Sequence, residues 1–367
     1  MPNLLNTGGG SPTGIAVYEG DLLPEAYRGA LIHCDAGPNV VRAYCTSPSA
    51  SAPTGVTKPG EPLPGATDAG AGYKAVATEL LKGDDKWFRP SDVCVAPDGS
   101  LLVADWYDPG VGGHNMQDKD PGEAKPTDWH HFRGRLYRVA PTGNKPAVPA
   151  LDLTTAAGQV AALRSPNVAR RYLAYTALRA GGAEANKALD DMFRTDPNPR
   201  MRARALWLLA RSADGKRHVE AALKDKDEDV RIAAFRAARL IKLDVPAVAM
   251  AVASDPSLGL AREAAVAMNY EPADKAVPVL VKLAERYDGN DRWYLEALGI
   301  GATGKEDAFL TAWSAAHKET SPAAEKLAWR MKKVEPTADA APATKPTGKT
   351  VDARTRTGAP EEGARPF

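Results

Sequence analysis

Polar side chains with donor atoms are concentrated in one loop of the sequence, between residues 105 and 120. This loop contains several glycines, which let a backbone bend sharply. It holds Asp105, Asp108, His114, Asn115, Asp118 and Asp120. Carboxylate and amide oxygens are the ligands that calcium prefers, and a histidine after two glycines is a candidate base or metal ligand. The loop is therefore the candidate site for chemistry.

Two interpretations of these carboxylates remain open. In the first, Asp105, Asp108 and Asp118 bind a metal ion, although their spacing is not that of an EF-hand. In the second, Asp105 ends a strand and caps the turn below it, while Asp118 is solvated. The sequence shows no Ser–His–Asp order, no glycine-rich phosphate loop and no HExxH motif.

A pair of short strands precedes this loop and positions it. Val93 and Val95 in the first strand, and Leu101 and Val103 in the second, are apolar at a period of two. A Pro-Asp-Gly turn joins them, in which proline fixes φ and glycine tolerates a positive φ. We expect a hairpin that delivers Asp105 to the strand end.

Similar short strands make up the rest of the first 143 residues. They are expected at residues 11–18, 30–35, 40–45, 73–81 and 133–139. Antiparallel strands joined by tight turns are typical of β-propeller blades, and residues 11–143 supply about two blades where a closed propeller needs about four. Residues 46–72 have few large apolar side chains and are expected to form a flexible insertion.

Three cysteines lie in this region, and their spacing matches no known framework. If Asp35 pairs with Val40 in the hairpin of residues 30–45, Cys34 faces Val41 and cannot reach Cys45. We therefore expect unpaired, partly buried thiols. The chain has no CxxC and no CxxCH motif, which excludes a zinc knuckle and a c-type haem.

The hydrophobic pattern changes to a helical period of about 3.6 at residue 152. Helix-start signals begin at residues 165, 196, 225, 255 and 288, as SPNVARR, DPNPRMR, DKDEDVR, DPSLGLAR and DGNDRW. One arginine follows each signal, at Arg171, Arg202, Arg231, Arg262 and Arg292, with steps of 31, 29, 31 and 30 residues. A fixed period of two helices indicates an α-solenoid of about five units over residues 152–333, with a last helix at residues 322–333.

Three long stretches carry a family resemblance: SPTGIAVYEGDLLPEAYRGALIHCDAGPNVVRAY, DKWFRPSDVCVAPDGSLLVADWYDPGVGGHN and RGRLYRVAP. Over about residues 11–333, the chain resembles the membrane-bound dehydrogenases of the Planctomycetes–Verrucomicrobia group. That resemblance implies a propeller similar to the glucose/sorbosone quinoprotein dehydrogenases, followed by HEAT repeats. It also implies that aspartates and arginines of neighbouring repeats form a polar ladder.

The resemblance places pyrroloquinoline quinone (PQQ) and calcium at the mouth of a complete propeller, with a catalytic base from an early blade. Asp105, Asp108, His114 and Asn115 would then lie near that mouth. The early blades and the haem motif of the family are missing from this sequence. We therefore expect PQQ and calcium only in a complete propeller, and no haem c.

Composition and charge limit the partners. A net charge of +1, with acidic residues interleaved among the arginines, argues against a nucleic-acid groove. No apolar run approaches the ~18 residues that span a bilayer. The start, MPNLLNTGGGSPTG, lacks a signal peptide, which predicts a cytoplasmic protein, or a periplasmic or secreted one if the chain is a fragment of the full-length family protein.

We therefore expect an α+β multidomain protein: a partial β-propeller at residues 11–143, a HEAT-like α-solenoid at residues 152–333 and a disordered tail at residues 334–367. The predicted function is a non-catalytic interaction scaffold whose solenoid binds a protein partner. The alternative is the C-terminal part of a PQQ- and calcium-dependent sugar or alcohol dehydrogenase.

Overall fold

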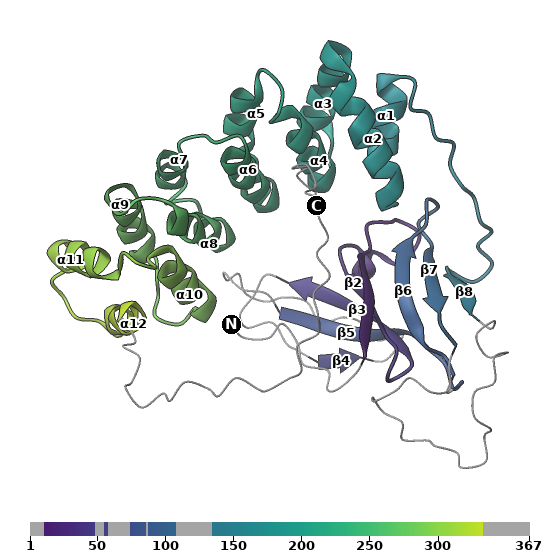
Figure 1. The fold of residues 1–367 in the computed structure, drawn as a ribbon, viewed down its shortest axis with the longest axis horizontal. Coiled ribbons are helices and arrows are strands. Elements are labelled where there is room, and N and C mark those ends of the chain that lie inside the picture. Colours follow the sequence, from purple (N-terminus) through teal and green to yellow (C-terminus); the bar gives the residue numbers. More distant parts are fainter. Residues whose placement is uncertain (1–10, 48–54, 58–73, 86, 108–133, 333–367) are drawn as a thin grey trace, which may run out of the picture. The chain divides into compact units, whose positions relative to one another are not determined.

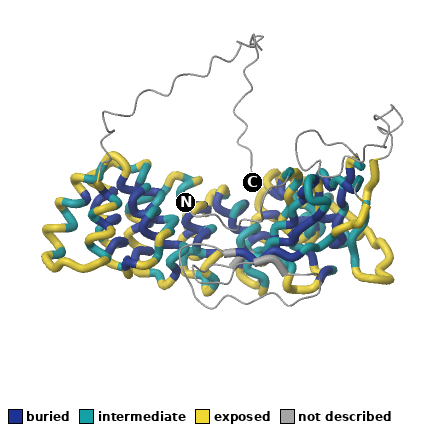
Figure 2. The backbone as a smooth tube through the Cα atoms, turned by 90° about the horizontal axis from the view of Figure 1, so that it is seen from below, coloured by how far each residue is buried: buried dark blue, intermediate teal, exposed yellow. Residues whose placement is uncertain are grey.

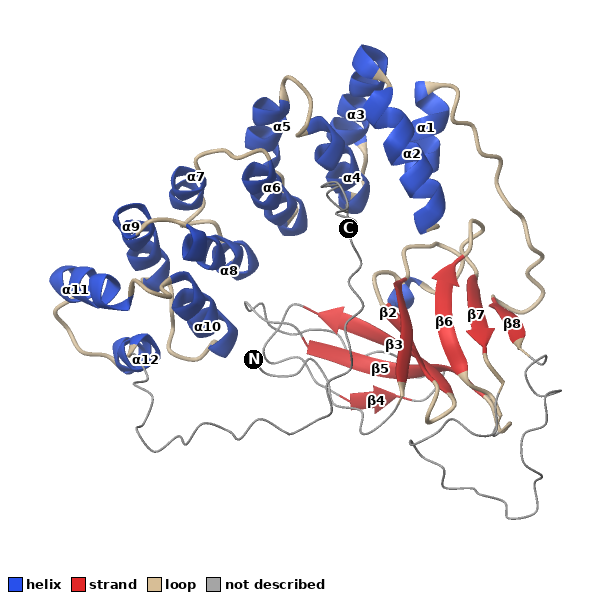
Figure 3. Cartoon of the chain, viewed as in Figure 1, coloured by secondary structure: helices blue, strands red, loops and turns tan. Residues whose placement is uncertain are grey.

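The computed structural model describes residues 11–47, 55–57, 74–85, 87–107 and 134–332 (Figure 1). The chain divides into two units, residues 1–331 and residues 332–367, and the elements below all belong to the first. Two sheets come first in the chain and twelve α-helices follow in its described part, so the fold class is α+β (Figure 3). The predicted tail at residues 334–367 lies outside the described residues.

The first sheet has the strand order β1-β2-β3-β5-β4. Its strands are β1 (Pro12–Val17), β2 (Leu31–Asp35), β3 (Val40–Ser47), β4 (Gly55–Thr57) and β5 (Lys74–Lys82). The first four strands in that order pair antiparallel, and Asp35 pairs with Val40 in the hairpin, as the turn between them predicts. Cys34 consequently faces Val41.

The prediction of a structureless insertion at residues 46–72 is wrong at two places. Strand β3 continues to Ser47, and β4 pairs in parallel with β5, with Val56 opposite Ala77. The free edge of β5 presents backbone N–H and C=O groups that need partners, and a three-residue segment satisfies them without any apolar pattern of its own. Residues 48–54 and 58–73 lie outside the described residues.

The second sheet has the order β6-β7-β8, with all pairs antiparallel. Its strands are β6 (Pro90–Val95), β7 (Leu101–Asp105) and β8 (Arg135–Val139). The predicted apolar alternation is confirmed, because Val93, Val95, Leu101 and Val103 are all buried. They share one core with Ile32 and other buried residues of the first sheet, so the two sheets pack together.

Tyr18 lies at the centre of this core and joins its parts. Its side chain is fully buried, its hydroxyl donates to the carbonyl of Gly99 at 3.0 Å, and the same hydroxyl accepts the N–H of Leu23 at 2.7 Å. A buried phenol is stable only where its hydroxyl has partners. The 97–99 turn is therefore held against the segment that follows β1.

The three cysteines are free thiols, as predicted. Burial raises the pKa of the Cys34 thiol to about 12 and that of Cys45 to about 11. Cys94 is exposed on β6. Because the thiolate is the reactive form, burial makes the Cys34 thiol less reactive at neutral pH.

The helices occupy residues 156–331 of the chain. They are α1 (Ala156–Leu163), α2 (Val168–Ala180), α3 (Gly182–Thr195), α4 (Pro199–Leu209), α5 (Gly215–Ala222), α6 (Glu228–Leu240), α7 (Val245–Ala251), α8 (Leu258–Ala267), α9 (Ala273–Ala284), α10 (Arg292–Gly301), α11 (Glu306–Ala316) and α12 (Pro322–Met331). Among the described residues, no helix has both the length and the apolar character that a membrane span requires.

All five predicted helix starts are confirmed, at α2, α4, α6, α8 and α10. Each helix has a side-chain cap that accepts a backbone N–H of the first turn, and the capping residues are Asn167, Asn198, Asp227, Ser257 and Asp291. Such residues satisfy N–H groups that the helix itself leaves unpaired. The local sequence therefore determines where these helices begin.

The even-numbered helices from α2 to α12 each contact the next one in the series, and odd-numbered helices pack beside them (Figure 1). Figure 2 shows buried residues along the middle of this helical region and exposed residues at helix ends and loops. Alanines such as Ala205, Ala234 and Ala264 are fully buried between helices. Small side chains allow close approach of the helices.

Gly301 illustrates how close this approach is. A β-carbon at this position would overlap the carbonyl oxygen of Ala265 in α8 and lie 2.8 Å from Leu280 Cδ2. We expect Gly301→Ala to lower the free energy of unfolding by about 1–3 kcal/mol, as overpacking does. Urea unfolding followed by circular dichroism measures it, with the exposed Ser314→Ala in α11 as control. Equal stability of both variants would contradict the close contact.

Candidate functional site

Asp105 ends β7, as predicted, and its carboxylate is buried. Its Oδ1 accepts the backbone N–H groups of Arg89 and Tyr107, both at 2.8 Å. Tyr107 has a φ of 53°, in the left-handed region, so Asp105 holds the chain in a sharp turn as it leaves the sheet. Its Oδ2 is buried and has no hydrogen-bond partner among the described residues.

The other predicted site residues, Asp108, His114, Asn115 and Asp118, lie outside the described residues. Within the described ranges, no group of three or more His, Cys, Asp or Glu side chains is close enough to hold a metal ion. Asp105 is therefore the one residue of the predicted loop site that the structure describes.

Aromatic and cationic side chains surround the end of β7. The guanidinium of Arg135 lies 3.5 Å from the centre of the Tyr107 ring, and the Trp87 ring lies 5.5 Å from that ring. Trp106, the residue between Asp105 and Tyr107, is exposed. Cation–π contacts of this kind stabilise exposed aromatic groups by about 0.5–1 kcal/mol. The contacts with Arg135 and Trp87, together with the hydrogen bond to Asp105, hold Tyr107 in its left-handed conformation.

The five arginines that follow the helix-start signals are called the repeat arginines below. Two of them bind the aspartate that begins the next helix-start signal. Arg202 donates through Nε and Nη2 to the two carboxylate oxygens of Asp225, at 2.9 and 2.7 Å. Arg231 makes the same contact with Asp255, at 2.7 and 2.9 Å. Each aspartate also accepts the backbone N–H two residues further on. Paired, two-point contacts of this geometry are strong and specific.

The other three repeat arginines also contact carboxylates. Arg262 lies 3.4 Å from Glu263 of its own helix, and Arg292 lies 2.5 Å from Glu296 of its own helix. Arg171 donates to the carbonyls of Ser165 and Pro166, and its Nη2 lies 3.0 Å from Glu19 in the sheet region. The two-point contacts of Arg202 and Arg231 join α4 and α6 to the segments that follow them.

Glu19 makes a junction that the sequence analysis missed. Its Oε2 lies 3.0 Å from Arg171 of α2 and 2.9 Å from Arg204 of α4, and all three side chains are mostly buried. Beside this junction, the Asn167 side chain donates to the carbonyl of Val95 at 2.7 Å. Glu19 follows Tyr18 with no local signal, so only the folded chain reveals its role.

Burial disfavours the charged form of both arginines of this junction. It lowers the pKa of Arg171 and of Arg204, and the charge of Glu19 opposes that effect in each case. Arg204 also donates to the carbonyl of Leu163 at 2.9 Å. The carboxylate of Glu19 therefore balances two buried positive charges, and its loss would leave them close together without compensation.

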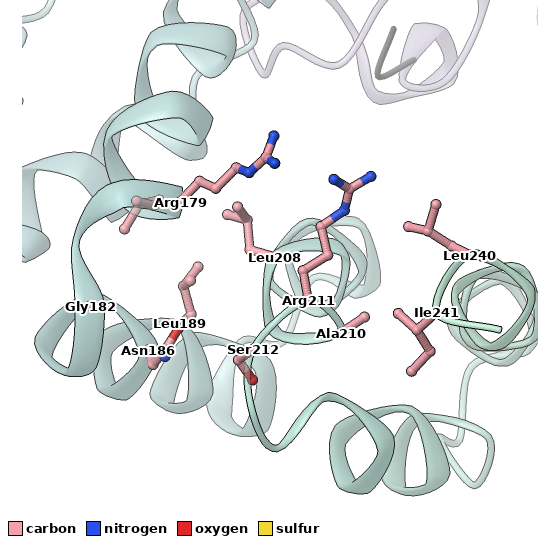
Figure 4. Close-up of a pocket in the computed structure, with 11 residues that line it drawn as sticks. Arg179, Gly182, Asn186, Leu189, Leu208, Ala210, Arg211, Ser212, Leu240 and Ile241 are labelled. Carbon is pink, nitrogen blue, oxygen red and sulfur yellow. The ribbon is translucent and has the colours of Figure 1, made fainter. Parts of the chain in front are cut away.

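A pocket of about 690 Å³ opens at the carboxyl ends of α2 and α4 (Figure 4). Its apolar lining comes from Leu178, Leu189, Leu208, Leu240 and Ile241. Arg179 and Arg211 extend over one side of it, and Leu208 lies between them. Both arginines are exposed. These two residues carry no distinctive signal in the sequence, because arginines are common at helix ends.

Fold and site together define an α+β protein in which two packed sheets precede a region of capped, closely packed helices. A family model described as a domain of unknown function (DUF7133) matches residues 7–143, the part that contains both sheets. No curated protein and no solved structure matches the chain. The match covers the sheets, and it assigns no activity to them.

Proposed function

We propose that the chain is a non-catalytic interaction scaffold, with a HEAT-like helical repeat as the surface that binds a protein partner. The observation that carries this proposal is an exposed apolar surface on α2. Val168, Tyr172 and Leu173 are 59%, 53% and 45% exposed within two turns of one helix. Clustered exposed apolar side chains mark interaction sites, and tyrosine is a frequent anchor in them.

The repeated geometry of the helices supports the proposal. Five helices with the same capping arrangement follow at intervals of about 30 residues, and two-point arginine–aspartate contacts join successive units at Asp225 and Asp255. In stacked repeats each unit contacts only its neighbours, so the array grows in one direction. Its length gives an extended surface for binding. The buried use of Asp105 in a backbone turn supports a structural role for that residue.

A retention experiment with immobilised full-length chain tests the proposal. We expect a protein partner, identified by mass spectrometry and then purified, to bind the Tyr172→Ser, Leu173→Ser double variant about tenfold or more weakly than the unmodified chain. Val148→Ser, an exposed apolar residue outside the helices, is the control and should change affinity less than about twofold. Equal affinity of the double variant and the control would overturn the proposal.

The alternative, the C-terminal part of a PQQ- and calcium-dependent dehydrogenase, is favoured by one observation. Strands β1, β2, β3 and β5 form a four-stranded antiparallel arrangement, which is the strand pattern of a propeller blade. On this alternative, the sheets are a partial propeller. Genomic DNA before Met1 tests it: further in-frame strand–turn–strand blades would support it, and a stop codon there would exclude it.

A further inference from the structure

The pocket at the carboxyl ends of α2 and α4 combines two positive charges with leucine and isoleucine side chains in its lining. Eleven residues line it in the part of the chain that the structure describes, and none of them carries a carboxylate. Among the described residues, neither Arg179 nor Arg211 has a hydrogen-bond or ion-pair partner through its guanidinium. The pocket is therefore electrostatically suited to a negatively charged group.

A third arginine, in the place in α6 that Arg179 has in α2, shows how such a side chain is used when it has a partner. Arg239 lies in the last turn of α6, and its guanidinium is 5.8 Å from the centre of the Tyr270 ring. No comparable ring faces the pair at the pocket, because none of the eleven lining residues is aromatic. The helix dipole favours a cation at each helix end, but it does not require two of them over one apolar cavity.

The apolar lining determines what kind of anion fits. Leu208 lies between the side chains of Arg179 and Arg211, and Leu240 and Ile241 close the far side of the pocket (Figure 4). A free inorganic anion would leave this apolar surface unfilled. A ligand that carries a carboxylate next to a large apolar group satisfies both the arginines and the leucines.

We propose that this pocket binds a segment of a protein partner in which an aspartate or glutamate stands beside a large apolar residue. This inference rests on the proposed function and assigns the chemistry of the partner. Nucleic acid fits less well, because single strands bind along a basic groove with aromatic rings for base stacking. The lining residues offer two arginines and no aromatic ring. Arginine pairs with a carboxylate through two parallel hydrogen bonds, which gives the contact its geometry.

Fluorescence anisotropy with synthetic peptides tests the inference on the full-length chain. The probe is a fluorescein-labelled peptide with an Asp-Leu-Glu-Leu core in a Gly-Ser frame. We expect saturable binding below about 1 mM. Binding should weaken about tenfold or more when the core becomes Asn-Leu-Gln-Leu, and also when it becomes Asp-Ser-Glu-Ser. Equal binding of the neutral peptide, or no binding of the probe, would overturn the inference.

Variants of exposed residues then place the binding in the pocket. Arg179→Glu combined with Arg211→Glu should abolish probe binding, and Leu240→Ser, whose side chain is 42% exposed, should weaken it about threefold or more. Lys275→Glu in α9 is the control. It changes the net charge by as much as each of the two arginine substitutions, and it should leave the affinity for the probe within about twofold. Unchanged affinity of the double arginine variant, with circular dichroism showing that it is folded, would overturn the inference.

Two further outcomes separate this inference from the proposed function. If the partner's binding depends on Tyr172 and Leu173 but the double arginine variant still binds it, the scaffold stands and the pocket assignment fails. If a single-stranded oligonucleotide displaces the peptide and binds more tightly through the same arginines, the peptide assignment also fails. Loss of partner binding in both sets of variants supports the scaffold and the pocket together.

Discussion

Replacing Glu19 with alanine is expected to lower the free energy of unfolding by about 3 kcal/mol. The physical reason is the pair of arginines that Glu19 contacts, at 3.0 and 2.9 Å. Without the carboxylate, Arg171 and Arg204 remain mostly buried beside each other. Removing one partner of a buried ion pair costs far more than an exposed pair contributes.

Urea unfolding followed by circular dichroism measures this effect, and limited proteolysis locates it. Residues 141–151 join the sheets to the helices as an exposed segment without helix or strand. In Glu19→Ala, we expect faster cleavage in this segment, because the junction that holds the sheet region against α2 and α4 is lost. Proteolysis of the open form follows the equilibrium population of that form when reclosing is fast.

Glu25→Ala is the matched control for this prediction. The Glu25 side chain is 88% exposed, and its closest basic partner, Arg28, is 3.7 Å away. Exposed pairs of this kind contribute about 0–1 kcal/mol. A Glu19→Ala variant that unfolds and is cleaved like Glu25→Ala would show that the junction contributes nothing to stability.

The parts of the fold that local sequence determines were predictable. Helix starts depend on one capping residue and the turn after it, and the hairpin of β2 and β3 depends on a short turn, so Asp35 and Val40 could be paired from the sequence. The alternation of Val93, Val95, Leu101 and Val103 likewise predicts which side of each strand is buried. These features need no knowledge of distant residues.

Features that depend on distant partners were not predictable. Strand β4 forms because β5 has a free edge, not because Gly55–Thr57 has a strong strand pattern. Glu19 is 185 residues from Arg204 in the chain, and no local spacing relates them. Arg179 and Arg211 look like ordinary helix-end arginines until the pocket brings them over the same leucines.

The repeat arginines combine a position that the sequence predicts with a partner that it does not predict. The period of about 30 residues predicts that they occupy equivalent positions, but it does not predict their partners. Arg202 and Arg231 reach an aspartate in the next unit, whereas Arg171 reaches Glu19 of the sheet region and Arg292 reaches Glu296 of its own helix. The partner depends on which carboxylate lies within reach after folding.

Arg202→Met is expected to destabilise the helical region by about 3 kcal/mol at pH 7. The Arg202 and Asp225 side chains are only 6% and 12% exposed, and two hydrogen bonds join them. Arg202 also donates to the carbonyl of Asp196 at 3.1 Å. Methionine preserves much of the side-chain volume and removes the charge, so Asp225 would remain partly buried without its partner.

The matched control is Arg194→Met, since Arg194 is 64% exposed and pairs with Asp190 on the same helix. That variant should lose less than about 0.5 kcal/mol. A double-mutant cycle with Asp225→Asn isolates the pair, and we expect a coupling energy of about 1–3 kcal/mol. Additive single losses would contradict a direct Arg202–Asp225 contribution.

The same pair predicts how this loss depends on pH. Burial alone would raise the pKa of Asp225, but hydrogen bonds and the charge of Arg202 outweigh it, so the pKa lies below its usual value. A carboxylate with a lowered pKa in the folded state stabilises the protein above its unfolded pKa, about 3.9, and loses that stabilisation as pH falls through the folded pKa. The stability gap between the unmodified chain and Arg202→Met should therefore be full at pH 6–7 and shrink below about pH 4. Urea unfolding at pH 7, 5 and 3.5 measures this gap, and a constant gap across that range would show that the loss comes from packing and not from the ion pair.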